Sequence, residues 1–178
     1  KSGADPKKVI VLDPFAADEM KALLARHGVS LNPAIAGIAN AEVILIAVKP
    51  QMMEEVLPAI VGLGASKPLI LSVAAGKTIA SFERHFGKSA AIIRTIPNTP
   101  ASIGRGITAM SANANVTAAQ MKLATELLSA IGEVVIVDRE ELIDSVTAVS
   151  GSGPAYVFYL TECLAAAAEK VGLPPALA

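Results

Sequence analysis

Aromatic residues, charges and cysteines are all scarce in this sequence. Only 3% of its 178 residues are aromatic and 17% are charged, whereas 53% are hydrophobic. The net charge of −1 gives no electrostatic reason to expect binding to nucleic acid or to an anionic membrane. The apolar content also excludes a disordered tail. Because this high apolar content is combined with few aromatic residues, we expect part of the apolar surface to be buried against another chain, in a homodimer or larger homo-oligomer.

The single cysteine, Cys163, excludes an internal disulfide framework and suits a reducing cytoplasm, where we expect the protein. No N-terminal stretch has the order of residues of a signal peptide. The longest uncharged run, Ser145 to Thr161, is broken by glycine and proline, so we do not expect it to span a membrane. His27 and His85 lie near the ends of predicted helices and are not candidates for an acid or a base. We predict no metal site.

Unbroken apolar runs alternate with amphipathic helical patterns over residues 1–138. Such runs are typical of strands that are covered on both faces, as in parallel sheets. We therefore predict an α/β fold with a parallel sheet and helices on both faces, followed at residues 139–178 by helices only. The predicted strands are 9–12, 43–48, 69–73, 90–95, 106–111 and 133–137, and the predicted helices are 16–27, 32–41, 52–61, 78–86, 117–131, 140–149 and 154–171.

Ligands of an open α/β sheet bind outside the carboxyl ends of its strands. Small residues, glycine and proline follow the predicted strands here and leave backbone N–H groups open. Such an edge suits a dinucleotide, whose phosphates and sugars are bound largely by backbone groups. The residues selected by this rule are Asp13, Pro14, Ala47, Val48, Lys49, Pro50, Val73, Ala74, Ala75, Gly76, Pro97, Asn98 and Thr99.

Several of these residues have a plain structural alternative. Asp13 ends a predicted strand, where an acid accepts hydrogen bonds from the adenosine ribose and disfavours a 2′-phosphate, so it predicts NADH rather than NADPH. Alternatively, it forms an Asx turn before Pro14. Lys49 is either a surface lysine or a ligand-facing one. Asn98 either caps a turn or presents its amide at the sheet edge, and Glu140 either serves a site or complements a helix dipole.

A G-x-G-x-x-G phosphate loop is absent. In dinucleotide folds the ribose acid follows this loop by about 20 residues, whereas Asp13 lies close to the first residue of this sequence. The sequence also stops at Ala178, where a further helix begins. We therefore expect a piece of a longer protein that lacks the first strand, the phosphate loop and most of the helical domain.

Glycine, serine and proline are concentrated at Ser150 to Pro154, which we call the SGSGP segment. Glycine permits close approach of backbone or ligand, and proline suits the first turn of a helix. By itself this pattern predicts that one helix ends or bends and that another begins at Pro154.

Three segments, in this order, resemble the pyrroline-5-carboxylate reductase family: Ala47 to Pro50, Arg94 to Pro100 and Asp144 to Tyr156. The resemblance extends from Val9 to Pro174. It implies a Rossmann domain over residues 1–138, and at 139–178 the start of a helical domain that dimerises and contributes to substrate binding. It also implies hydride transfer from NAD(P)H to the C=N carbon of L-1-pyrroline-5-carboxylate, which gives L-proline in the last step of proline biosynthesis.

The resemblance assigns roles to individual positions. Asp13 would meet the adenosine ribose, and residues 47–50 and 73–75 would line the cofactor. Ile96 to Thr99 would approach the nicotinamide. The substrate would lie near Glu140, Thr147, Ser150 and Gly151. In family members a Ser-Pro-Gly-Gly-Thr-like segment of the partner subunit binds the substrate carboxylate and offers a hydroxyl. It is absent here, so the proton donor is expected beyond residue 178.

Two other functions stay open at this stage. The first is a β-hydroxyacid dehydrogenase or another imine reductase, although no catalytic lysine helix follows residue 139. The second is a non-catalytic dinucleotide-binding or dimerisation module. Fold-level analogy alone does not separate these functions.

Overall fold

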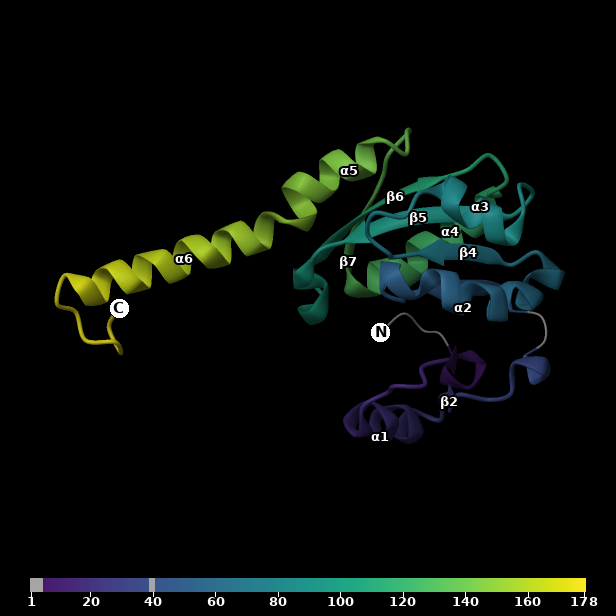
Figure 1. Ribbon diagram of the computed structural model, residues 1–178, viewed down its shortest axis with the longest axis horizontal. Helices are drawn as coiled ribbons and strands as arrows, with labels where there is room; N and C mark the ends of the chain where they lie inside the picture. The colour runs from purple at the N-terminus through teal and green to yellow at the C-terminus, as the bar shows by residue number, and fades with distance from the viewer. Residues whose placement is uncertain (1–4, 39–40) are drawn as a thin grey trace.

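The structure is a computed structural model that describes residues 5–38 and 41–178. Its largest unit is a five-stranded sheet with helices on both faces (Figure 1). The predicted α/β fold is therefore confirmed. In spatial order the strands are β3 (Val43–Ile46), β4 (Leu69–Ser72), β5 (Ala91–Pro97), β6 (Gly106–Ala112) and β7 (Gly132–Ile136).

The sheet is mixed, which corrects the prediction that its strands all run parallel. Strands β3, β4 and β5 pair in parallel, but β6 pairs antiparallel with β5, and β7 runs parallel to β6. A parallel connection needs a crossover of about a dozen residues or more. Residues 98–105, which contain the 3-10 helix η5 (Thr99–Ile103), are too few for one. The chain therefore reverses direction between β5 and β6.

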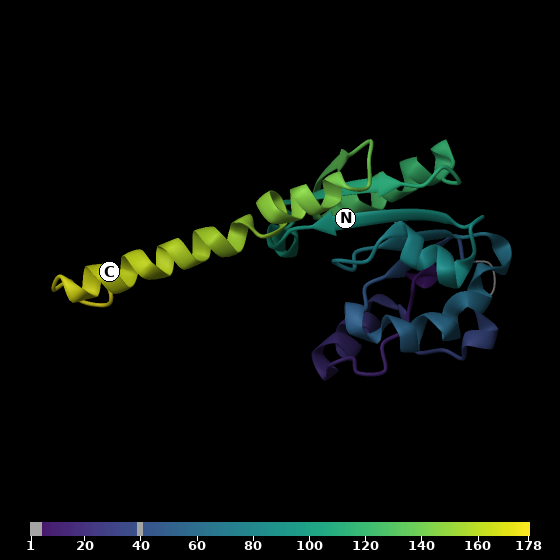
Figure 2. The ribbon, with the colours of Figure 1, turned by 45° about the horizontal axis from the view of Figure 1, so that its top comes forward.

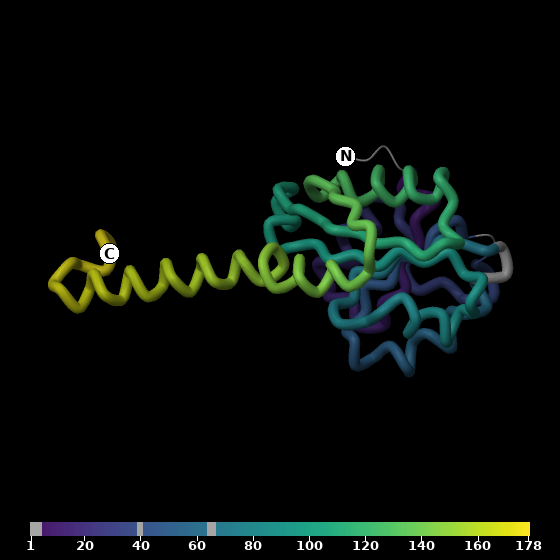
Figure 3. Tube along the Cα trace, turned by 90° about the horizontal axis from the view of Figure 1, so that it is seen from above, coloured from purple at the N-terminus to yellow at the C-terminus, as the bar shows by residue number. Residues whose placement is uncertain are grey.

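Two apolar layers hold the helices on the sheet. Helices α2 (Met53–Ile60) and α3 (Ile79–Phe86) pack on one face, where Leu57 and Phe82 are fully buried. Helix α4 (Ala118–Leu128) packs on the other face. Figure 3 shows the sheet as a middle layer, with α4 in green above it and α2 in blue below. Burial of each large apolar side chain stabilises the fold by about 1.5–3 kcal/mol.

Two of the predicted helix starts, at Thr78 and Thr117, are confirmed by side-chain caps. The hydroxyls of Thr78 and Thr117 each accept a backbone N–H from the first turn of the helix that follows, and Thr117 forms a capping box with Gln120. The helix predicted over residues 32–41 is a single 3-10 turn at Ile35–Gly37. Residues 39 and 40 of that prediction lie outside the described residues.

The chain before residue 39 forms a separate unit. Strands β1 (Ile10–Val11) and β2 (Ser30–Leu31) pair in parallel as a two-stranded sheet, connected by α1 (Asp18–His27). This purple unit lies beside the large sheet in Figure 1. The strand predicted at 9–12 is present but short, and Val9 remains 40% exposed.

After β7 the described residues form only helices. They are α5 (Leu142–Val146), a π-helical turn at Thr147–Gly151, and α6 (Gly153–Lys170). Helix α6 projects away from the sheet in Figures 1 and 2, and none of its residues is buried. The domain boundary that we predict at residue 139 falls between β7 and α5. Among the residues that the structure describes, no helix is both long and apolar enough to cross a membrane.

Candidate functional site

The loops predicted to bind a cofactor follow adjacent parallel strands and lie at one edge of the sheet. The register pairs Ile46 with Ser72 and Ser72 with Arg94, so β3 and β4 end level with each other and β5 continues beside them to Pro97. The backbone N–H of Val73 donates to the carbonyl of Ile46 at 3.1 Å, and Thr95 Oγ1 donates to the carbonyl of Ser72 at 2.9 Å. These bonds hold the predicted loops together at the carboxyl ends of their strands.

Exposure differs among the residues of this edge. Two are buried, and they supply an apolar wall: Ala74 and Ile96. The exposed ones are Ala47, Lys49, Ala75 and Thr99, and the half-buried ones are Val48, Pro50, Val73, Pro97 and Asn98. Lys49 thus has the exposure of a surface lysine. The edge therefore offers mainly backbone groups and small side chains to a ligand.

Asp13 is held in the β1–β2 unit by hydrogen bonds to Phe15 and Asn32. Its Oδ1 accepts the N–H of Phe15 at 2.9 Å, so the Asx-turn alternative is present. The side chain of Asn32 accepts the N–H of Asp13 at 2.7 Å and donates to the Asp13 carbonyl at 2.8 Å. Asn32 has a positive φ of 50°, which asparagine tolerates better than most residues. Sequence reasoning missed Asn32, whose partner lies 19 residues away.

Asn98, which follows β5, forms hydrogen bonds with the start of β6 and with the SGSGP segment. Its Oδ1 accepts the N–H of Ile107 at 2.9 Å, which ties the end of β5 to the start of β6. Its Nδ2 faces the carbonyl of Ser150 at 3.4 Å and Ser150 Oγ at 3.5 Å. A Cβ on Gly151 would lie 3.6 Å from Ile96 Cγ1. The structure therefore brings the predicted nicotinamide loop against the predicted substrate-binding residues.

The SGSGP segment begins within the π-helical turn, and α6 begins at Gly153, one residue before the predicted helix start at Pro154. Thr147 Oγ1 donates to the carbonyl of Ile143 at 2.7 Å, and the Ser152 N–H donates to the Thr147 carbonyl at 2.8 Å. Tyr156 Oη donates to the Ala148 carbonyl at 3.2 Å. The side chains of Thr147 and Tyr156 thus donate hydrogen bonds to backbone carbonyls in and next to the π-helical turn. Such turns are frequent at functional sites.

The carboxylate of Glu140 accepts hydrogen bonds from two other parts of the chain. Its Oε1 accepts the N–H of Ile79, the first residue of α3, at 2.8 Å and an N–H of Arg94 at 3.2 Å. Arg94 is only 3% exposed and also donates to Asp144 Oδ1 at 2.6 Å. Glu140 thus lies at the amino end of a helix, but this helix is α3 and not the one predicted to begin at residue 140. Sequence reasoning missed the role of Arg94, although an arginine inside an apolar strand signals that carboxylates must pair with it.

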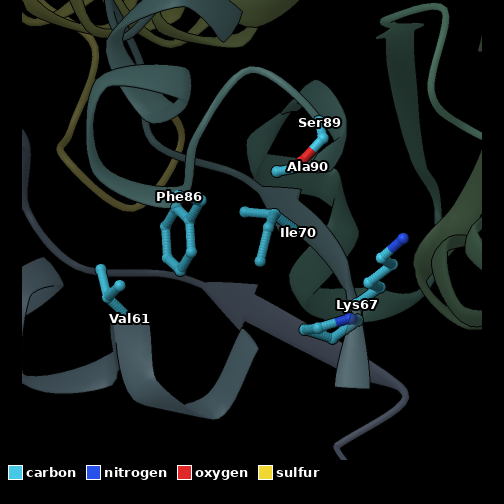
Figure 4. Close-up of a pocket in the computed structure, with 7 residues that line it drawn as sticks. Val61, Lys67, Ile70, Phe86, Ser89 and Ala90 are labelled. Atoms are coloured by element: carbon cyan, nitrogen blue, oxygen red, sulfur yellow. The ribbon is translucent and has the colours of Figure 1, made fainter. Parts of the chain in front are cut away.

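Two further features of the described chain can be compared with the candidate edge: clusters of metal-ligating side chains and a surface hollow. Among the described residues, no group of three or more histidine, cysteine or acidic side chains is arranged to hold a metal ion. Figure 4 shows a hollow of about 90 Å³ at the amino ends of β4 and β5, opposite the candidate edge. It is too small for a dinucleotide, because ligand pockets usually enclose about 300–1,000 Å³. Its lining residues are Val61, Lys67, Pro68, Ile70, Phe86, Ser89 and Ala90.

Comparison with known proteins relates the first and the last part of the chain to known families. The family described as "Pyrroline-5-carboxylate reductase dimerisation" matches residues 140–178. The family described as "NADP oxidoreductase coenzyme F420-dependent" matches residues 1–76. The first match covers the π-helical turn and α6, and the second covers β1 to β4 and the loop that follows β4.

Individual relatives agree with these matches. The pyrroline-5-carboxylate reductase of Synechocystis sp. is 43% identical over 97% of this chain and 64% of its own length. A solved pyrroline-5-carboxylate reductase from Coxiella burnetii has a TM-score of 0.86 at 35% identity, over 98% of this chain and 65% of its own. The Plasmodium falciparum pyrroline carboxylate reductase, solved with NADP bound, has a TM-score of 0.82 at 26% identity, over 97% of this chain and 62% of its own. The chain thus spans somewhat less than two thirds of these relatives.

Proposed function

We propose that the protein to which this chain belongs reduces L-1-pyrroline-5-carboxylate to L-proline with NAD(P)H, as its similarity to the pyrroline-5-carboxylate reductases supports. This reaction is the last step of proline biosynthesis. The observation that carries the proposal is the convergence at the sheet edge. There the loop predicted to meet the nicotinamide contacts the π-helical turn through Asn98 and Ser150, and both residues lie in the motifs that prompted the family resemblance.

The described residues fit part of a dinucleotide. The loops after β3, β4 and β5 offer small side chains and backbone groups to sugars and the nicotinamide, with Ala74 and Ile96 as apolar wall. The Gly-rich loop that would hold the phosphates has no counterpart in these 178 residues. When bound, NAD(P)H supplies the hydride.

The residues of the site would act mainly by positioning. A protonated cyclic imine needs little acid catalysis at carbon, because the incoming hydride neutralises its charge. Rate then depends on holding the imine carbon about 3–3.5 Å from the hydride donor. Asn98 fixes the distance between the cofactor loop and the π-helical turn, and Gly151 has no side chain that would fill the space between Thr147 and Ile96. The proton donor would come from a segment beyond residue 178.

The proposed activity is tested with the intact reading frame. We expect oxidation of NADH or NADPH in the presence of L-1-pyrroline-5-carboxylate, with L-proline as the product. The control is the same assay with 2- or 3-hydroxyacids and the oxidised cofactor. Absence of turnover with the imine would overturn the proposal, and turnover with a hydroxyacid would favour the dehydrogenase alternative.

We further propose that Asp13 sets the preference for NADH. Asp13→Asn should shift the ratio of kcat/KM values for NADH and NADPH about tenfold towards NADPH, because it removes a charge that would repel the 2′-phosphate. The asparagine oxygen can still accept the Phe15 N–H, so the Asx turn and the unfolding midpoint should be kept. Asp13→Ala removes the turn as well and serves as the comparison. An unchanged cofactor ratio in Asp13→Asn would show that Asp13 is only a turn residue.

We propose a homodimer or larger homo-oligomer that forms through the helical domain. The exposed apolar surface of α6 supports this assembly. A cytoplasmic location is proposed from the single, unpaired Cys163, which suits a reducing compartment.

A further inference from the structure

Arg94 carries a charge into the interior of the sheet. It lies in β5 between Ser72 of β4 and Ser111 of β6, and all three residues are buried. A buried charge is tolerated only when it is paired and hydrogen-bonded. Its two carboxylate partners, Glu140 and Asp144, come from the segment that leads from the sheet into the helical domain.

Glu140 joins this ion pair to a cofactor loop. The same oxygen that accepts from Arg94 also accepts the N–H of Ile79 at the start of α3. Residues 73–78, which connect β4 to α3, include the predicted cofactor-binding residues 73–75. The β4–α3 loop and the segment before α5 are therefore fixed to one arginine.

Asp144 joins the ion pair to the π-helical turn. It precedes Thr147 by one helical turn, and its neighbour Ile143 packs with Ile96 and Ala109 while accepting a hydrogen bond from Thr147 Oγ1. A rotation or shift of α5 would therefore move Ser150 relative to Asn98.

We propose that Arg94 is a positioning residue, which acts through Glu140 and Asp144 to set the placement of the π-helical turn relative to the cofactor loops. This inference rests on the proposed function, because the placement matters for hydride transfer to a substrate held between the two. Arg94 touches neither substrate nor cofactor in this role. Its guanidinium donates to two carboxylates through separate nitrogens, Nη1 and Nη2. A lysine ammonium has a single nitrogen and cannot reproduce this geometry.

A substitution of Asp144 tests the positioning role without leaving the charge of Arg94 unpaired. Its side chain is 73% exposed, and Asp144→Ala leaves Arg94 paired with Glu140, so the charge in the sheet stays compensated. In the intact protein, we expect Asp144→Ala to lower kcat/KM for the imine by about tenfold to a hundredfold, because a misplacement of about 1 Å can cost a hundredfold in rate. The KM for the cofactor and the unfolding midpoint should stay close to those of the wild type. The matched control is Glu141→Ala, which removes an exposed carboxylate three residues earlier and should change neither.

A double-mutant cycle separates positioning from a general loss of stability. If Arg94 acts through Asp144, adding Asp144→Ala to Arg94→Lys should lower kcat/KM little further, because the shared effect is already lost. Equal kinetic constants for Asp144→Ala and Glu141→Ala would overturn the inference. So would an Arg94→Lys variant with a lower unfolding midpoint and unchanged kcat and KM values.

Failure of the positioning inference can be distinguished from failure of the proposed function. If the wild-type protein does not turn over the imine, the proposed function fails. Amide hydrogen exchange still tests whether Asp144 holds the π-helical turn in place. Faster exchange at residues 147–153 in Asp144→Ala than in Glu141→Ala would support the positioning role. Equal exchange in the two variants would overturn it.

Discussion

Glutamate in place of Phe158 will prevent assembly of the intact protein and leave the five-stranded sheet folded. Phe158 is 65% exposed on α6 and lies on the part of the chain that projects from the sheet (Figure 1). Burying an unpaired carboxylate in an apolar interface costs at least several kcal/mol, which exceeds what most interfaces can lose. Light scattering at micromolar concentration should report a monomer, whereas the wild type should be at least a dimer.

The reason for this expectation is the distribution of apolar residues around α6. Large side chains stand on every side of the helix rather than along one stripe, and they are Tyr156, Val157, Phe158, Tyr159, Leu160 and Leu164, each about 60% exposed or more. A helix that is apolar all round is normally buried. Most of the stability of a helix in a protein also comes from the packing of its apolar face rather than from its intrinsic propensity. Assembly and helix formation should therefore be coupled.

The control places a glutamate where α6 already carries a charge. Lys170→Glu changes the last residue of the helix and should leave the oligomer intact, with only a small unfavourable effect at the helix terminus. Circular dichroism should show lost helix for Phe158→Glu and retained helix for the control. A Phe158→Glu protein of unchanged mass in solution would contradict the proposal that α6 is the assembly surface.

The strands that could be predicted are those whose signal is local. Residues 43–48 form a continuous apolar run that stops before Lys49-Pro50, and residues 69–73 follow Pro68 and are apolar except for Ser72. The strands observed there start and end within two residues of the prediction. The direction of β6 depends instead on the length of the connection before it. Residues 98–105 are too few for a crossover helix, so this signal was available in the sequence and would have predicted the reversal.

Long-range partners account for most of what the sequence did not reveal about the site. Arg94 is separated from Glu140 by 46 residues and from Asp144 by 50, and Ile79 is separated from Glu140 by 61. No local pattern specifies which carboxylates reach a buried arginine. In contrast, the small and proline-rich loops after β3, β4 and β5 could be identified, because the position of a strand end already places them at one edge.

Alanine in place of Gly132 should lower the free energy of unfolding by about 3 kcal/mol or more. Gly132 begins β7 with φ at 145° and ψ at −156°, a conformation that is essentially confined to glycine. A Cβ there would also overlap the backbone of Gly106, its partner in β6. The change can be measured by denaturant unfolding of the intact protein. Gly37→Ala is the matched control, because no atom lies within 4 Å of its new Cβ and its φ is not positive.

The effect of Gly132→Ala should extend to the candidate site. Gly106 is packed between Gly132 and Ala101 of η5, where a Cβ on Gly106 would lie 2.8 Å from the Ala101 Cα. The next residue, Ile107, donates its N–H to Asn98, which in turn faces Ser150. Displacing Gly106 therefore displaces the group that holds Asn98, so kcat/KM for the imine should fall under conditions in which the variant is still folded. A folded Gly132→Ala protein with unchanged kinetic constants would mean that Asn98 is held without the β6–β7 contact.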